Sequence, residues 1–122
     1  MLTSMTIETT AKRLVEYCRK RRHLVAIEEL YSDYCISREM PGVPNSVVKG
    51  KEAILKKNEE WFSLVSEFHR NQISDPVITE NFFCCQMSLD VTFKGSERMV
   101  LNELCVYEVL EGQVVSEQFF YR

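Results

Sequence analysis

Residues 102–121 read Asn102-Glu103-Leu104-Cys105-Val106-Tyr107-Glu108-Val109-Leu110-Glu111-Gly112-Gln113-Val114-Val115-Ser116-Glu117-Gln118-Phe119-Phe120-Tyr121. The Glu111-Gly112 pair, set between two runs of β-forming residues, predicts a hairpin. Strand side chains alternate between two faces, so each of two acids falls in a mainly apolar row. These rows are Glu103 with Cys105, Tyr107 and Val109, and Glu117 with Val115, Phe119 and Tyr121. A carboxyl group there needs a partner, a shifted pKa or a ligand, which predicts a pocket.

The hairpin continues a series of strands that begins near residue 68. The clearest is 82–93, whose alternation separates a wholly apolar face from a mostly polar one. The apolar face holds Phe83, Cys85, Met87, Leu89, Val91 and Phe93. An earlier strand is predicted over 68–78, where Asp75-Pro76 marks a bulge or an edge. Strands over 99–110 and 114–121 complete an antiparallel meander.

The part of the chain before residue 67 is predicted to be mainly helical. Apolar residues at helical spacing over 7–18, with Thr6 as the cap, predict a first helix, and 24–31 a second. A short strand over 34–39 and a Pro/Gly loop precede a third helix from about Lys51. The chain is therefore expected to be one α+β domain over residues 1–122, with the helices on one face of the sheet. If the sheet curls, the two layers enclose a cone-shaped ligand cavity.

Composition excludes several classes of function. The net charge of −3 argues against binding to nucleic acid, because such proteins present a basic face. The basic run 19–22 is interpreted as the end of the first helix. No apolar run is long enough to span a membrane, and residues 1–6 show no signal peptide. Five cysteines without a Cys-x-x-Cys motif favour reduced thiols in the cytoplasm over disulfides or a zinc site.

Several segments resemble one family. They are the second-helix pattern 26–33, the helix start Gly50-Lys51-Glu52-Ala53-Ile54, and the ending 111–121. In order and spacing the chain is similar to SnoaL-like proteins of the nuclear transport factor 2 superfamily, which includes ketosteroid isomerase and scytalone dehydratase. The resemblance covers nearly the whole chain and implies the helix-on-sheet fold. Activity is less constrained, because a fold of this kind hosts enzymes and non-enzymes alike.

The resemblance also implies roles for particular residues. Ketosteroid isomerases have a general-base acid where Glu39 lies and a neutral, hydrogen-bond-donating acid near Glu103. Their oxyanion tyrosine corresponds to about Val15, and the nearest tyrosine here, Tyr17, is offset by two residues. In SnoaL-like relatives a histidine often lines the cavity where His69 lies.

We therefore expect four catalytic candidates, Glu39, His69, Glu103 and Glu117, to converge on one cavity. The expected walls are Tyr17, Trp61, Tyr107, Phe119 and Tyr121. Each candidate has a structural alternative: a paired buried acid, a solvated strand end or a satisfied strand histidine. His23, among basic residues, is predicted to be a surface residue. Neither a cofactor nor a metal is expected, because no short ligand spacing supports a metal.

Two functions remain open. The chain could be a cofactor-independent isomerase, dehydratase or cyclase acting on a small apolar carbonyl compound, with Glu39 or His69 as base and Glu103 as donor. Alternatively, it is a non-catalytic ligand-binding or dimerisation module. A homodimer is predicted in either case, because an uncharged patch faces away from the cavity. The patch comprises Cys84, Gln86, Ser88, Val106, Leu110, Gln118 and Phe120.

Overall fold

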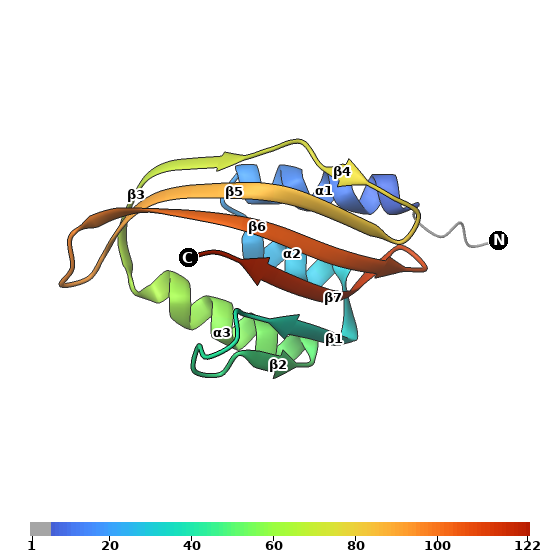
Figure 1. Ribbon diagram of the computed structural model, residues 1–122, viewed down its shortest axis with the longest axis horizontal. Coiled ribbons are helices and arrows are strands. Elements are labelled where there is room, and N and C mark those ends of the chain that lie inside the picture. The colour runs from blue at the N-terminus through green and yellow to red at the C-terminus, as the bar shows by residue number, and fades with distance from the viewer. Residues whose placement is uncertain (1–5) are drawn as a thin grey trace.

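The computed structural model describes residues 6–122, which form three helices and seven strands (Figure 1). Residues 1–5, on which the expectation about a signal peptide partly rests, lie outside this range. The elements are α1 (Ile7–Arg19), α2 (His23–Leu30), β1 (Tyr31–Arg38), β2 (Val47–Lys49), α3 (Lys51–Ser63), β3 (Val65–Ile73), β4 (Val77–Ile78), β5 (Phe82–Phe93), β6 (Arg98–Leu110) and β7 (Gln113–Phe120).

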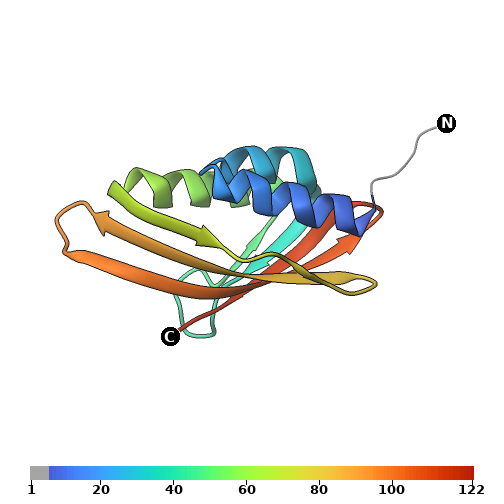
Figure 2. The same cartoon turned by 90° about the horizontal axis from the view of Figure 1, so that it is seen from above.

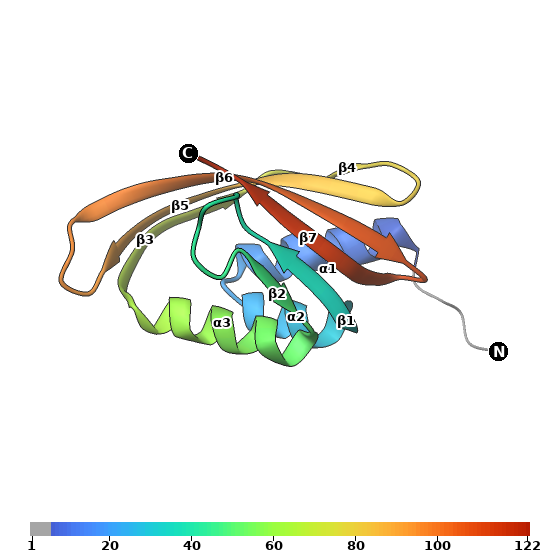
Figure 3. The ribbon, with the colours of Figure 1, turned by 60° about the horizontal axis from the view of Figure 1, so that its bottom comes forward.

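The strands form one sheet in the order β2-β1-β7-β6-β5-β3, with β4 paired to β5. Neighbouring strands are antiparallel except for β1 and β7, which run parallel. All three helices lie on the same face of this sheet, and the other face is bare (Figure 2). Figure 3 shows that the sheet curves around the helices, with α3 facing its concave side. The expected α+β architecture is confirmed.

The helices are fixed on the sheet by apolar stripes. Thr6 caps α1 by accepting a hydrogen bond from the Thr9 backbone N–H, as expected. Leu14 and Val15 on α1 and Ile54 on α3 are almost completely buried against the inner face of the sheet. Burying an aliphatic side chain of this size contributes about 2 kcal/mol, so the stripes hold the cavity walls in place.

Two irregularities decide which side chains face the helices. In β3 the pairing with β5 shifts between Phe68 and Arg70. In β7 the pairing with β6 shifts so that Val109 opposes Val114 while Glu108 opposes Ser116. The second bulge changes the row that was expected to share a face with Glu117. Val114 is fully buried, whereas Val115, the unpaired residue of the bulge, is only half-buried.

Other differences from the expected elements are small. The first strand begins at Tyr31, which was assigned to the second helix, and the three-residue β2 was not expected. The parallel pairing of β1 with β7 was not expected either, because it joins segments about 80 residues apart, as in the pair Ser37 and Glu117. All five cysteines are free thiols. Among the described residues, no helix combines the length and the apolar character needed to cross a membrane.

Candidate functional site

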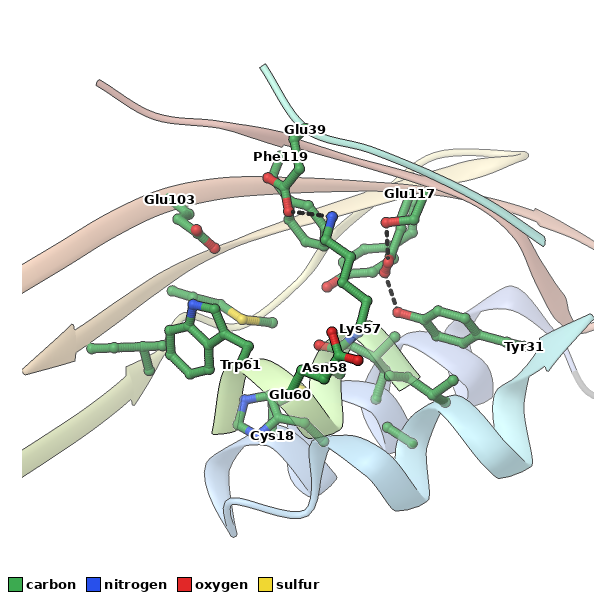
Figure 4. A pocket seen from close by; sticks show the side chains of 18 of the residues that line it. Cys18, Tyr31, Glu39, Lys57, Asn58, Glu60, Trp61, Glu103, Glu117 and Phe119 are labelled. Carbon is green, nitrogen blue, oxygen red and sulfur yellow. Dashed lines mark hydrogen bonds and ion pairs between the residues drawn. The ribbon is translucent and has the colours of Figure 1, made fainter. Parts of the chain in front are cut away.

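A cavity of about 500 Å³ lies between the concave face of the sheet and the helices (Figure 4). Its wall combines apolar side chains with several charged ones. The sheet side includes Ser37, Met87, Leu89, Glu103, Tyr107, Glu117 and Phe119, and the helix side Leu14, Cys18, His23, Ala26, Ile27, Lys57, Asn58, Glu60 and Trp61. A mainly apolar cavity with a few polar groups is the usual form of a small-molecule site.

One part of this cavity, which we call the closed end, is formed by Glu117, Tyr31 and Ser37. The Glu117 side chain is 3% exposed. One carboxyl oxygen accepts a short hydrogen bond from the Tyr31 hydroxyl, and the other accepts one from Ser37 Oγ at 2.7 Å. Burial raises the pKa of Glu117, although the two hydroxyl hydrogen bonds act in the opposite direction. The closed end is thus a self-contained hydrogen-bonded cluster that ties β1 to β7.

The opposite part of the cavity, the open end, is formed by Glu103, Glu39, Lys57 and Trp61. The Glu103 carboxyl group points from β6 toward the side where Trp61 lies (Figure 4). Within residues 6–122 it makes no side-chain hydrogen bond. Burial, followed by the negative charges of Glu39 and Glu117, raises the pKa of Glu103 to about 7, although Lys57 lowers it. Glu103 therefore exchanges its proton near neutral pH.

Glu39, just after β1, has two partners at the open end. Its Oε1 is 3.1 Å from the ammonium nitrogen of Lys57, which reaches up from α3. Its Oε2 accepts a hydrogen bond of 3.0 Å from the Tyr121 hydroxyl. The Glu39 and Lys57 side chains are only 18% and 32% exposed, so this ion pair is partly shielded from solvent. The arrangement holds a carboxylate in a fixed position within the same space as Glu103.

The open end continues into a second hollow of about 650 Å³. The two spaces share Glu39, Pro44, Lys57, Trp61 and Glu103. Beyond them the second hollow is lined mainly by apolar residues, including Phe93, Met99, Leu101 and Tyr121. The residues of the open end therefore separate an inner cavity from an outer one.

The expected convergence of four catalytic candidates is only partly correct. Glu39, Glu103 and Glu117 line the same cavity, but His69 does not. The bulge in β3 turns His69 onto the opposite face of the sheet, where its Nε2 is 2.8 Å from Thr92 Oγ1 and 3.8 Å from the carboxylate of Glu67. The four-residue constellation does not exist, because its only histidine faces away from the acids.

The aromatic walls follow the expectation with one exception. Trp61, Tyr107 and Phe119 line the inner cavity, and Tyr121 lines the second hollow. Tyr17 is not part of either wall. Its hydroxyl donates a 2.6 Å hydrogen bond to Glu29 on α2, because a two-residue offset turns a helical side chain by about 200°.

His23 was expected on the surface and instead lines the cavity. Its imidazole packs against Phe62, with ring centroids 5.1 Å apart. Burial lowers the pKa of His23 to about 4. Lys57 was also missed, although a signal existed: it stands three residues after Ile54 and four before Trp61, on the same helical face.

Nothing in the described residues suggests a metal centre. No group of three or more His, Cys, Asp or Glu side chains is arranged to hold an ion between residues 6 and 122. What the cavity offers is a titrating acid, a fixed carboxylate and aromatic walls. These groups can hydrogen-bond a polar ligand atom and move a proton.

Residues 5–121 match the model of the SnoaL-like domain family, and the chain belongs to this family. A proposed SnoaL-like polyketide cyclase from Mesorhizobium loti is similar in structure, with a TM-score of 0.90 and 30% sequence identity over 96% of this chain and 100% of that one. The family and fold expected from the sequence are thereby confirmed.

More distant structures share the fold. A protein of unknown function from Burkholderia pseudomallei, described as like nuclear transport factor 2, has a TM-score of 0.79 at 12% identity, over 97% of this chain and 92% of that one. A proposed isomerase from Rhodopseudomonas palustris has a TM-score of 0.68 at 11% identity, over 96% and 90%. No curated protein sequence matches the chain.

Proposed function

We propose that this protein binds a small, mainly apolar carbonyl compound in its cavity and rearranges it by proton transfer without a cofactor. The observation that carries this proposal is the Glu103 carboxyl group, which is half-buried, lines the cavity and has no side-chain hydrogen-bond partner within residues 6–122. A buried polar group with no protein partner is costly unless a ligand or water completes it. The names of similar structures, polyketide cyclase and isomerase, agree with this class of chemistry.

In the proposed reaction, neutral Glu103 donates a hydrogen bond to the carbonyl oxygen of the substrate. Glu39 takes the proton from the adjacent carbon, and the electron pair of the broken C–H bond moves toward the carbonyl to form an enolate. The hydrogen bond from Glu103 stabilises the charge that develops on the oxygen. In a ketone with a neighbouring C=C bond, the charge of the enolate is shared with the γ-carbon, and return of the proton from Glu39 to that carbon completes an isomerisation. In a β-hydroxyketone, the enolate electrons instead form a C=C bond as the C–O bond breaks, and the hydroxyl group leaves as water with the proton held by Glu39.

Glu117 has a different part in this proposal. Its two oxygens are held by Tyr31 and Ser37 and the residue is only 3% exposed, so it supports the wall and adds negative charge rather than touching the substrate. Glu39 is also held by two side chains, but its own side chain is 18% exposed and it lines both hollows, so a substrate can reach it. His69 has no role, because it lies on the other face of the sheet. The same satisfied cluster also favours the alternative function, a binding module in which the acids are structural.

Screening planar ketones by ligand-induced shifts in melting temperature, followed by turnover assays, tests the proposal. Binding stabilises the folded state by mass action, about 2.7 kcal/mol at a ligand concentration of 100 Kd. We expect Glu103→Leu to weaken binding and abolish turnover. The matched control is Glu108→Gln on the same strand, whose carboxylate faces away from the cavity and accepts from Ser116. If the wild type binds ketones without turning them over, the ligand-binding module is favoured. If it binds no ketone, the proposed chemistry is contradicted and a module without this chemistry is favoured.

We also propose a homodimer formed by the bare face of the sheet. On this face Leu104 pairs in register with Phe120 and Gln86, and Val106 with Gln118 and Cys84. Leu104, Phe120 and Leu110 are 45%, 41% and 51% exposed, an apolar surface of the kind that interfaces cover. Light scattering at micromolar concentration is expected to give twice the chain mass, and Leu104→Lys the mass of one chain. A monomeric wild type contradicts the proposal.

The curved sheet and its helical cover support the expected cone shape of the cavity. The five free thiols support the expected cytoplasmic location, since reduced cysteines persist in a reducing compartment. Fractionation of cells that express the tagged protein tests the location.

A further inference from the structure

His23 is the first residue of α2, and its imidazole is enclosed by apolar and aromatic neighbours at the helix side of the cavity. Both of its ring nitrogens are buried, and neither has a hydrogen-bond partner within residues 6–122. Leaving a buried donor and a buried acceptor unpaired destabilises the free protein. A leucine or phenylalanine would fill this position without that cost.

The imidazole is neutral at physiological pH, because burial keeps its pKa near 4. A neutral ring offers one N–H donor and one acceptor nitrogen. A hydroxyl group can pair with either nitrogen and a carbonyl group with the N–H, whereas a carboxylate would lose its hydration among the apolar neighbours of the ring. Rotation of the ring about its Cβ–Cγ bond, a broad torsion, would turn a nitrogen toward the cavity that the ring already lines.

The position of His23 complements that of Glu103. Glu103 projects from the sheet, whereas His23 belongs to the helical layer that covers the sheet. The cavity that both residues line has apolar side chains such as Leu89 and Trp61 in the rest of its wall. A ligand held at both points has polar atoms at two ends and an apolar body between them.

We propose that His23 is a specificity-determining residue that hydrogen-bonds a second polar group of the ligand, so that the protein selects compounds with a hydroxyl or carbonyl group at the end remote from the reacting carbonyl. This inference rests on the proposed function, because it takes the reacting carbonyl to lie at Glu103. It assigns His23 to substrate selection and gives it no part in the proton transfer.

The test compares two probes, 1-tetralone and 6-hydroxy-1-tetralone, which differ only in the remote hydroxyl group. Dissociation constants are measured for the wild type, His23→Leu and His23→Asn, with His69→Leu as the matched control on the other face of the sheet. We expect the wild type to bind the hydroxylated probe about tenfold more tightly, which is the contribution of one buried hydrogen bond. His23→Leu should bind both probes equally, and His23→Asn, which keeps a donor and an acceptor, should restore part of the difference.

The melting temperatures of the free variants separate a ligand contact from a structural role. Because His23→Leu removes two unpaired nitrogens, the free variant should melt at or above the wild-type temperature. An unchanged preference for the hydroxylated probe in His23→Leu, or a melting temperature several degrees lower, overturns the inference.

The probes also separate this inference from the proposed function. Suppose that binding of 1-tetralone depends on Glu103, but the preference for 6-hydroxy-1-tetralone is the same in the wild type and in His23→Leu. In that case only the inference about His23 fails. If neither probe binds the wild type, the proposed carbonyl-binding function is contradicted, and so is the inference about His23 that rests on it.

Discussion

The two ends of the cavity each hold a glutamate, and the two carboxyl groups differ in whether the protein supplies their hydrogen-bond partners. At the closed end, Glu117 accepts hydrogen bonds from Tyr31 and Ser37 and is complete without a ligand. At the open end, Glu103 is half-buried and has no side-chain hydrogen-bond partner in the described chain, and its pKa is raised to about 7. Burial alone therefore does not mark a functional acid. What distinguishes Glu103 is burial combined with a missing partner on the cavity side.

The largest expected effect comes from breaking the closed end. Glu117→Ala leaves the Tyr31 and Ser37 hydroxyls buried without their acceptor, and it removes the tie between β1 and β7. We expect the free energy of unfolding to fall by about 3 kcal/mol. Urea unfolding at neutral pH measures this. Glu117→Gln keeps one acceptor oxygen and should lose less. A loss below about 1 kcal/mol in the alanine variant would show that the cluster is dispensable.

At the open end, the effect of replacing Glu103 on the free energy of unfolding is expected to depend on pH. The pKa of Glu103 is higher in the folded state, about 7, than its ordinary value of 4.5. Its contribution to stability is thus fully present below pH 4.5 and is lost as pH rises through 7, by about 3 kcal/mol at most. Glu103→Gln is neutral throughout this range, so its free energy of unfolding should not show this loss. The variant should therefore be at least as stable as the wild type near neutral pH.

Urea unfolding of both proteins at a series of pH values measures this difference. A variant is needed because the titration of His23 changes the stability of the wild type in the opposite direction. The folded-state pKa of His23 is lowered, so the protein loses stability as pH falls from 6.5 to about 4. Comparison with Glu103→Gln removes this shared contribution. Glu108→Gln, on the outer face of the same strand, is the matched control. Titration of Glu103 by NMR at or below about 4.3 would contradict the prediction.

The smallest effect is expected from Lys57, which belongs to the open end but acts on the acids of both ends. Its positive charge lowers the pKa of both Glu103 and Glu117. Lys57→Met should therefore raise the pKa of Glu103 further, while the loss of a partly exposed ion pair costs less than about 1 kcal/mol. NMR titration of the glutamate carboxyl carbons measures the shift. Lys56→Met, an exposed neighbour on α3, is the control, and an equal shift in both variants would rule out a specific effect of Lys57.

Much of this architecture follows from local patterns in the sequence. The alternation over 82–93 and the Glu111-Gly112 turn correctly predicted β5 and the last hairpin, and with them the side of the sheet that Glu103 faces. The helical stripe around Leu14 and the Thr6 cap correctly predicted α1. These features depend on the period of a strand or a helix and on turn chemistry, which neighbouring residues fix among themselves.

The tertiary structure decided the rest, and the two histidines show why. Strict alternation from the buried Ile73 would place His69 on the inner face, but the bulge between Phe68 and Arg70 inverts it. Arg21, with φ of 59°, lies in the short turn between α1 and α2, and beyond this turn the His23 ring packs against Phe62 on α3, at the wall of the cavity. The partners of Glu39 and Glu117 likewise come from distant segments. A single extra residue in a strand or one left-handed residue in a turn redirects a side chain, and whether it is adopted depends on packing between segments far apart in the chain.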